Sequence, residues 1–449
     1  MLLAWSWLTA GLISSSIAIL QYFGAASDFS PWINQTRYGE AFANLRQRNQ
    51  FATLTNISLS ALIWLMLQNA KSERESEKST GTIIFLGCIA AGLLMVGNAA
   101  SSSRTGFFEL LLLCVLCGLW GLWRKRDVRW VLRCAVLVYA VAAFAMPYLA
   151  GLDLSLHGVA ARLGQDDVCG SRLLLWSNVL HLIAQKPLLG WGVGELDYAH
   201  FITLYNEPRF CDILDNAHNL PLHLAVELGV PAALLICGGF VWWMVRQKPW
   251  AEQDATRQMA WAVIAVILLH SMLEYPLWYG PFQMAFGICV LLLWRKKQPV
   301  EAVNSSKKTS NWSIAIIVRA QAAIFLIAFI IFAVWDYHRI SQIYLEPESR
   351  AEAYRTDTLN KIRGSWLFSD QVQFAELLTT PLTSANAEWT LQTAKQLLHY
   401  SPESRVVEKL IESAVLLGKD DEALAYLARY KAAFPKEHAL WVNASQKRP

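Results

Sequence analysis

Two short stretches of the chain carry side chains that could transfer a proton. Residues 215–229 centre on His218, and further along the chain His270 and Glu274 lie four residues apart before a run of aromatic residues. A neutral imidazole accepts a proton near pH 7, so His218 is the candidate general base. Ordinary capping or hydrogen bonding is the alternative for His218, and His270 could simply pair with Glu274. The histidine spacing does not match His-Glu-x-x-His and no third ligand is evident, so the sequence predicts no metal site.

Arginines precede two apolar segments and could bind an anion. Arg46 and Arg48 come just before Asn49 and Gln50, and Arg104 follows a run of three serines. A planar guanidinium matches the oxygens of a carboxylate or a phosphate. For any single arginine an internal carboxylate is the expected partner, whereas for the group a phosphate-bearing ligand is the better explanation.

The composition indicates that a membrane domain holds these residues. Of 449 residues, 55% are hydrophobic and 16% are charged, and the net charge is +4. This balance excludes disorder, an ordinary soluble enzyme and a nucleic-acid-binding protein, because a polyanion partner requires a concentrated basic surface. Continuous apolar runs of bilayer-spanning length predict helices. We expect an all-α, polytopic protein with about nine transmembrane helices, near residues 2–23, 51–67, 82–99, 106–123, 130–150, 224–245, 258–273, 281–294 and 313–335.

Lysines and arginines predict the orientation of these helices. The short loops on one side carry 15 basic residues, and the loops on the other side carry eight. The more basic side is cytoplasmic by the positive-inside rule. The long loop 151–222 and the C-terminal segment therefore both lie outside, in the periplasm of a Gram-negative cell.

The cysteines agree with this topology. Six of the eight lie in apolar segments, where a thiol acts as a small hydrophobic group. Cys169 and Cys211 flank the outer loop in an oxidising compartment, so we expect a disulfide between them. Two free thiols are the alternative.

The outer loop contains signals for a helix, a turn and a second helix. Residues 171–185 have apolar positions at helical spacing, which predicts an amphipathic helix that lies in the membrane interface or packs against neighbouring spans. Glycines at every second position over 190–194 predict a turn in which the backbone can approach a ligand closely. After the turn, Asn216 or Asn219 can cap a helix that runs on into the sixth span.

The C-terminal segment has the charge content of a soluble domain. Residues 336–449 hold 15 acidic and 14 basic residues. We therefore expect a membrane domain over 1–335, with the loop 151–222 included, and a helical domain over 336–449. Within the latter, residues 401–435 resemble one tetratricopeptide repeat. This domain either binds an acceptor protein or packs over the outer loop.

Together these motifs resemble the O-antigen ligase and polymerase superfamily, most closely the PglL-like protein O-oligosaccharyltransferases that glycosylate pilins. The similarity covers most of residues 40–300. Family members usually have further spans upstream, so the first span here corresponds to a later one, and they often have Pro at the position of Arg48. The resemblance rests on Asn49-Gln50, Ser103-Arg104-Thr105-Gly106, the stretch from Arg172 through Trp176 to Gly194, Asn216-Ala217-His218-Asn219, and His270 to Trp278.

The resemblance implies transfer of a whole glycan from undecaprenyl pyrophosphate to a Ser or Thr hydroxyl of an exported protein such as a pilin. The reaction would take place on the periplasmic side of the bacterial inner membrane, with no metal, cofactor or nucleotide sugar and with membrane lipids around the site. His218 corresponds to the family's essential loop histidine, and Arg104 to an arginine near the pyrophosphate. The substrate-binding candidates are Asn49, Gln50, Arg46, Arg48, Arg172, His270 and Glu274.

Three other functions are open to a chain of this kind. An O-antigen ligase or polymerase would use a glycan or lipid A-core acceptor, and an acceptor assay separates it from a protein glycosylase. A polysaccharide transporter or lipid flippase would show paired repeats and midplane charges, which this sequence lacks. A non-catalytic assembly protein would leave the outer arginines and His218 without a common ligand.

Overall fold

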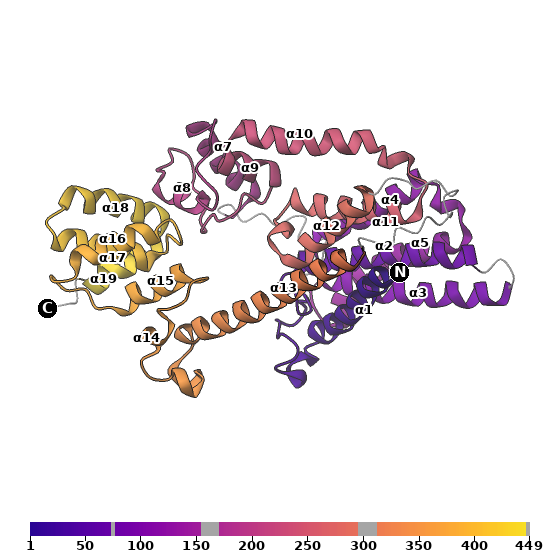
Figure 1. The fold of residues 1–449 in the computed structure, drawn as a ribbon, viewed down its shortest axis with the longest axis horizontal. Coiled ribbons are helices and arrows are strands. Elements are labelled where there is room, and N and C mark those ends of the chain that lie inside the picture. Colours follow the sequence, from indigo (N-terminus) through magenta and orange to yellow (C-terminus); the bar gives the residue numbers. More distant parts are fainter. Residues whose placement is uncertain (73–76, 154–169, 295–311, 446–449) are drawn as a thin grey trace. The chain divides into compact units, whose positions relative to one another are not determined.

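The computed structural model describes residues 1–72, 77–153, 170–294 and 312–445, and all regular structure in those ranges is helical (Figure 1). The predicted all-α class is therefore confirmed. Short 3-10 turns connect several helices, at Ala25–Phe29, Leu122–Arg124, Pro249–Ala251, Pro276–Trp278, Gln342–Tyr344, Pro347–Ser349 and Glu352–Tyr354.

A helix lies at each predicted membrane span. Six helices within the described ranges are long and apolar enough to cross a bilayer, and two shorter apolar helices accompany them. The protein is thus an integral membrane protein, whereas the total of nine spans stays a prediction. The helices are α1 (Leu2–Tyr22), α2 (Arg48–Ser72), α3 (Glu77–Ala100), α4 (Arg104–Leu119), α5 (Arg126–Leu149), α10 (Val230–Gln247), α11 (Ala255–Ser271), α12 (Gly280–Trp294) and α13 (Trp312–Ser341).

The chain forms two compact units. The first consists of residues 1–172, 216–225 and 230–297, and the second of residues 173–215, 226–229 and 298–449. The predicted domain boundary at residue 335 is based on charge content and stays a prediction.

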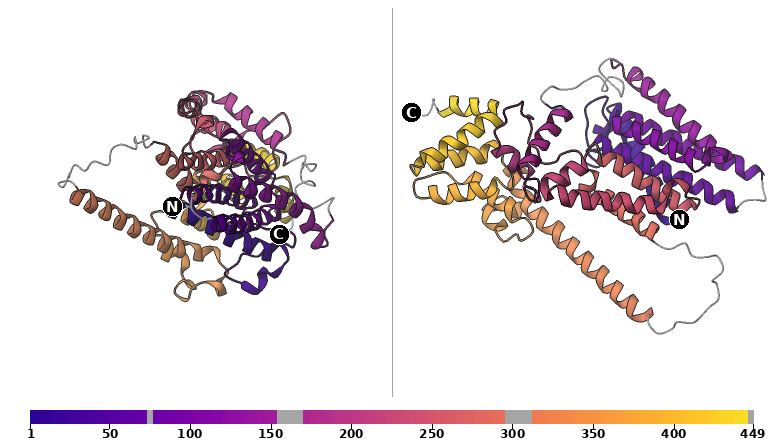
Figure 2. Two further views of the ribbon diagram at one scale, coloured as in Figure 1. Left: turned by 90° about the vertical axis from the view of Figure 1, so that its right-hand side faces the viewer. Right: turned by 90° about the horizontal axis from the view of Figure 1, so that it is seen from above.

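Helix α2 is the centre of the first unit. It packs against α1, α3, α4, α5 and α11 and is almost entirely buried, while α3 and α5 lie side by side (Figure 2). Small residues permit this close packing, as they do in membrane helices generally. A Cβ added to Gly11 of α1 would lie 2.2 Å from the Ser58 hydroxyl of α2, and one added to Gly97 of α3 would lie 2.5 Å from the Ser15 hydroxyl of α1.

The helix that was predicted to enter the sixth span without a break is interrupted at Gly229. Helix α9 (Leu220–Leu228) ends there and α10 begins at Val230. Gly229 has a φ of +86°, and a Cβ there would lie 2.1 Å from the carbonyl oxygen of Leu188. The prediction of one continuous helix was wrong, because the break comes from contact with a segment 40 residues earlier.

The glycine turn over 190–194 packs against the end of α9. The Trp191 N–H donates to the Val226 carbonyl at 2.8 Å, and the Gly192 N–H donates to the Glu227 carbonyl at 3.0 Å. The predicted turn is present, but the group that its backbone approaches is the C-terminal turn of a helix and not a ligand.

The second unit joins the outer loop to the C-terminal helices. The predicted helix over 171–185 is present as α7 (Arg172–Gln185), and one of its faces is buried. Helix α8 (Leu196–Ile202) packs against α18 (Asp420–Ala433), with Phe201 of α8 in the apolar core of the C-terminal helices. Packing against the loop is thus observed. The other C-terminal helices are α14 (Thr358–Ile362), α15 (Ser369–Thr379), α16 (Ala387–Leu397), α17 (Ser404–Leu416) and α19 (Pro435–Ser445).

The predicted helix pair over 401–435 is present as α17 and α18. The two helices pack together, and Gly418 turns the chain between them with a φ of +67°. The assignment of this pair as a tetratricopeptide repeat stays a prediction.

Candidate active site

Loops and helix ends of the first unit bring the candidate residues together. Helix α2 begins at Arg48 and α4 at Arg104, and both helices pack against α11. Thr53, near the start of α2, contacts Glu109 of α4 and His270 near the end of α11. The hydroxyl of Ser103 caps α4 by accepting the Gly106 N–H at 3.0 Å. A Cβ on Gly106 would lie 2.5 Å from that of Ala52, so glycine lets α4 approach α2 closely.

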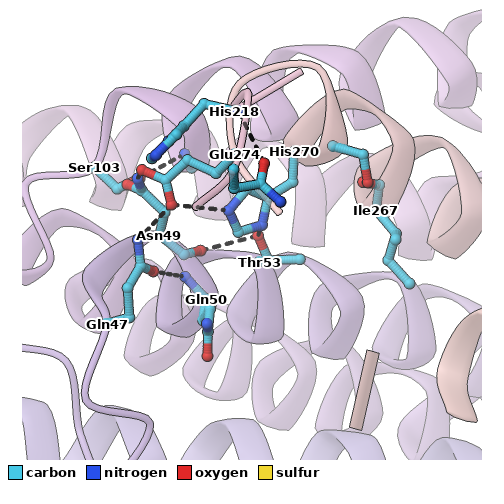
Figure 3. Close-up of polar contacts among 12 residues, drawn as sticks. Gln47, Asn49, Gln50, Thr53, Ser103, His218, Ile267, His270 and Glu274 are labelled. Carbon is cyan, nitrogen blue, oxygen red and sulfur yellow. Dashed lines mark hydrogen bonds and ion pairs between the residues drawn. The ribbon is translucent and has the colours of Figure 1, made fainter. Parts of the chain in front are cut away.

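The Glu274 carboxylate contacts polar groups from three segments that are distant from one another in the sequence (Figure 3). Its Oε2 accepts from Gln47 Nε2 at 2.5 Å, and its Oε1 accepts from Asn49 Nδ2 at 2.5 Å. Arg172 Nη2 lies 3.1 Å from Oε1, and His270 Nε2 lies 3.5 Å from Oε2. The predicted pairing of His270 with Glu274 is therefore present, as one contact among several.

The partners of Glu274 keep its carboxylate ionised. Burial acts to raise the pKa of Glu274, but a hydrogen bond and positive charge from His270, with the charges of Arg172 and His218, lower that pKa below its ordinary value. A fixed negative charge thus lies beside His218 at neutral pH.

His218 has a backbone conformation that is uncommon for residues other than glycine. Its φ is +50°, and its N–H donates to the Asn216 side-chain oxygen at 2.8 Å. The ring meets Tyr275 edge-on, with ring centroids 5.0 Å apart, and lies close to Glu274 in Figure 3. Asn219 caps α9 by accepting the Leu222 N–H at 3.2 Å. The capping role considered for His218 therefore belongs to Asn219. Residues with a strained backbone, as His218 has, cluster at functional sites.

The other histidine of this region, His223, lines a small cavity together with Glu274 and Trp278. Its ring meets Trp278 edge-on, with centroids 5.5 Å apart. Burial, followed by the nearby charge of His218, lowers the pKa of His223 to about 4, so this ring is neutral at pH 7.

A second polar layer, inside the bundle, was not recognised from the sequence. Thr53 Oγ1 of α2 lies 2.8 Å from His270 Nδ1 and 2.6 Å from Glu109 Oε1 of α4. Asn56 Nδ2 donates to Glu109 Oε2 at 2.9 Å. The spacing of Asn49, Thr53 and Asn56 places them on one face of α2, and this polar face is the signal that could have revealed the layer.

A pocket of about 290 Å³ opens beside Glu274. Arg46 and Arg48 line it together with Asn49 and Ser101. Within the described part of the chain, no hydrogen-bond or ion-pair partner is found for the guanidinium groups of Arg46 and Arg48. Arg46 also has a φ of +60°. The carboxylates of Glu40 and Glu274 also line the pocket, but among the described residues neither forms an ion pair with Arg46 or Arg48.

Two of the predicted site residues lie at the edge of this arrangement. Arg104 follows Ser103, whose hydroxyl donates to Asn49 Oδ1 at 2.5 Å, so the backbone of Arg104 is next to the site. No described residue pairs with the Arg104 guanidinium. Gln50 is 5% exposed, and its side chain points away from Glu274 (Figure 3). Asn49, Arg172, His218, His270 and Glu274 are brought together, whereas Gln50 is not.

Cys211 of the outer loop is disulfide-bonded, and Cys169, its predicted partner, lies outside the described residues. The six cysteines in the apolar segments are free thiols. Over the described ranges no group of three or more His, Cys, Asp and Glu side chains could hold a metal ion.

Comparisons with known proteins agree on the family. A family described as O-antigen ligase matches residues 89–237, a family described as protein glycosylation ligase matches residues 41–66, and the C-terminal part of a virulence-factor membrane-bound polymerase family matches residues 258–449. The chain is similar to the O-antigen ligase superfamily. Within it, the chain is close to the PglL-like enzymes.

Two curated relatives of this O-antigen ligase homologue come from Acinetobacter baylyi. A ComP-specific O-oligosaccharyltransferase is 24% identical over 64% of this chain and 49% of its own length. A general O-oligosaccharyltransferase is 24% identical over 69% of this chain and 53% of its own length. The chain therefore spans about half the length of these relatives. No solved structure matches it.

Proposed function

We propose that this protein transfers an oligosaccharide as one unit from undecaprenyl pyrophosphate to a Ser or Thr hydroxyl of an exported, pilin-like protein. The observation that carries the proposal is the position of His218 close to the ionised Glu274, which itself lines a pocket that also contains Arg46 and Arg48. The names of the two Acinetobacter relatives supply the type of reaction.

The arginines would bind the donor. A pyrophosphate diester carries two negative charges, and Arg46 and Arg48 line a pocket of about 290 Å³. Glu40 and Glu274 share that lining, but among the described residues neither forms an ion pair with these arginines. Guanidinium groups suit phosphate oxygens because two parallel N–H donors match two oxygens. We place Arg104 in the same role because the start of α4 is joined to Asn49.

The transfer step exchanges one bond to the anomeric carbon for another. The acceptor oxygen forms a bond to that carbon while the bond from that carbon to the pyrophosphate oxygen breaks. The pyrophosphate leaves with the electron pair and gains one negative charge, which the arginines stabilise. His218 takes the acceptor proton, and Glu274 stabilises the resulting imidazolium.

The location of the site follows from this chemistry. The prenyl chain must stay in the bilayer while its headgroup reacts, which requires an active site at the ends of membrane helices. Because the basic loops belong to the opposite ends, we assign the site to the periplasmic side of the inner membrane.

The test is transfer by the purified full chain in lipid vesicles. The vesicles contain undecaprenyl-pyrophosphate-linked oligosaccharide, and a pilin-like protein and a lipid A-core glycan are supplied in parallel as acceptors. We expect glycan on the protein, and loss of transfer in His218→Ala and Arg104→Ala. His338→Ala and Arg124→Ala, both exposed in the structure, are the matched controls and retain transfer. Full activity of His218→Ala would refute its role as base.

An O-antigen ligase activity is the second candidate. The match of residues 89–237 to the O-antigen ligase family favours it. Glycan found on the lipid A-core acceptor and not on protein would select this function.

A further inference from the structure

Glu109 is a carboxyl group that the proposed reaction does not use. It lies in α4, fully buried, and its contacts are with neutral groups: the Thr53 hydroxyl at 2.6 Å and the Asn56 amide at 2.9 Å. No cation of the described residues pairs with it. A buried carboxylate without a counter-charge is costly, so this group requires an explanation.

The hydrogens around Thr53 can be counted. Three atoms lie within hydrogen-bond distance of Thr53 Oγ1: the Asn49 carbonyl oxygen at 2.9 Å, Glu109 Oε1 at 2.6 Å and His270 Nδ1 at 2.8 Å. A hydroxyl has one hydrogen to donate and can accept two. A carbonyl can only accept, so all three contacts are hydrogen bonds only when the single hydrogen of Thr53 goes to the Asn49 carbonyl. Both Glu109 and His270 must then donate to Thr53.

The contacts of the other carboxyl oxygen of Glu109, Oε2, are consistent with a proton on Oε1. Asn56 Nδ2 donates to Glu109 Oε2 at 2.9 Å and to the Gly106 carbonyl at 3.0 Å. The carbonyl of Gly106 identifies the amide nitrogen of Asn56, because an oxygen there would face another acceptor. Oε2 is therefore an acceptor, and the proton of Glu109 belongs on Oε1.

The same count of hydrogens shows which ring nitrogen of His270 donates to Thr53. With a hydrogen on Nδ1 directed to Thr53, the other ring nitrogen, Nε2, faces Glu274 Oε2 at 3.5 Å. His270 is fully buried, so this contact chain and its packing determine the ring's orientation. The chain of contacts runs from Glu109 inside the bundle through Thr53 and His270 to Glu274.

We propose that Glu109 is a positioning residue, held as a neutral carboxylic acid, which orients His270 through Thr53 and thereby holds Glu274 toward His218. This inference rests on the proposed transfer reaction for its consequence, but its proton assignment does not. A network that only joins α2, α4 and α11 is the competing explanation, and it predicts effects on stability alone.

The kinetic test uses pairs of variants in the vesicle assay. Glu109→Gln keeps both contacts, since an amide N–H can donate to Thr53 while its oxygen accepts from Asn56, and we expect activity within about twofold of wild type. Glu109→Leu and Thr53→Val should lower kcat about tenfold or more with the donor KM unchanged, because His270 would no longer hold the Glu274 carboxylate in position. Thr53→Ser should restore activity. An equally buried hydroxyl of α2, Thr55, contacts Asn98 and Ala52, so Thr55→Val is the matched control for stability.

Infrared spectra of the full chain test the protonation without any substrate. We expect a band from a protonated, buried carboxylic acid that is lost in Glu109→Gln. The inference is overturned if that band is unchanged, if Glu109→Gln is as inactive as Glu109→Leu, or if Thr53→Val loses no more activity than Thr55→Val. An inactive wild type would refute the proposed function, and the infrared result would still decide the state of Glu109.

Discussion

The polar site around Glu274 in the first unit and the contact between α8 and α18 in the second unit are stabilised by different kinds of interaction. Glu274 is largely buried and is held by amide, guanidinium and imidazole groups. In the second unit, Phe201 is 2% exposed in an apolar core with Phe434. Burial of apolar area is non-directional and stabilises a fold, whereas a charged network depends on geometry. The contrast suggests that changes to the first region affect chemistry and changes to the second affect stability.

Glu274→Gln is expected to have the largest effect and tests the first half of this contrast. The amide removes the negative charge beside His218 and leaves Arg172 without its anion. Transfer should fall about 100-fold or more, which corresponds to about 2.7 kcal/mol in the barrier. The measurement is kcat/KM in vesicles, with thermal unfolding measured in parallel. A large drop in melting temperature with little change in kcat/KM would remove the distinction between the two regions.

Phe201→Ala tests whether changes in the second unit affect stability. Removing a buried aromatic side chain leaves a cavity and should destabilise the contact between α8 and α18 by about 3 kcal/mol. Hydrogen exchange of the full chain should show faster exchange in both helices. Leu204→Ala is the matched control, because Leu204 is an exposed apolar residue of the same loop. Equal exchange in the two variants would contradict the burial argument.

The same contrast explains what the sequence could predict. Apolar runs located each predicted membrane helix because their signal is local and continuous. The break at Gly229 was not predicted, since it depends on the Leu188 carbonyl of another segment. His270 and Glu274 were recognised as a pair because they lie four residues apart.

The rest of the site required the fold. Gln47 and Asn49 reach Glu274 across more than 220 residues of sequence. Such contacts have no local periodic signal, because they exist only once the starts and ends of different helices meet. Glu109 was noticeable as a carboxyl in an apolar helix, but its partner Thr53 was not.

Asp197 provides a pH-dependent test within the second unit. Burial, with the nearby charges of Asp215 and Glu195, raises the pKa of Asp197 from 3.8 to about 7, although the Tyr198 N–H partly opposes this. Between about pH 4 and pH 7 the folded state keeps a proton that the unfolded state has lost. Stability therefore falls as pH rises through this window and is level above it. Hydrogen-exchange protection of α8 should decrease from pH 5 to pH 8, after correction for intrinsic rates, and Asp197→Asn should remove that decrease.

The ion pair at the edge of the loop contact should matter least. His399 Nδ1 lies 2.7 Å from Glu195 Oε2, and the His399 ring stacks on Tyr198 with centroids 3.8 Å apart. The two side chains of the pair are 47% and 28% exposed, so solvent screens their attraction. A double-mutant cycle of His399→Ala and Glu195→Ala, read by hydrogen exchange of α8, should give a coupling below about 1 kcal/mol. A coupling near that expected for Phe201→Ala would mean that charge, and not apolar burial, holds the loop to the C-terminal helices.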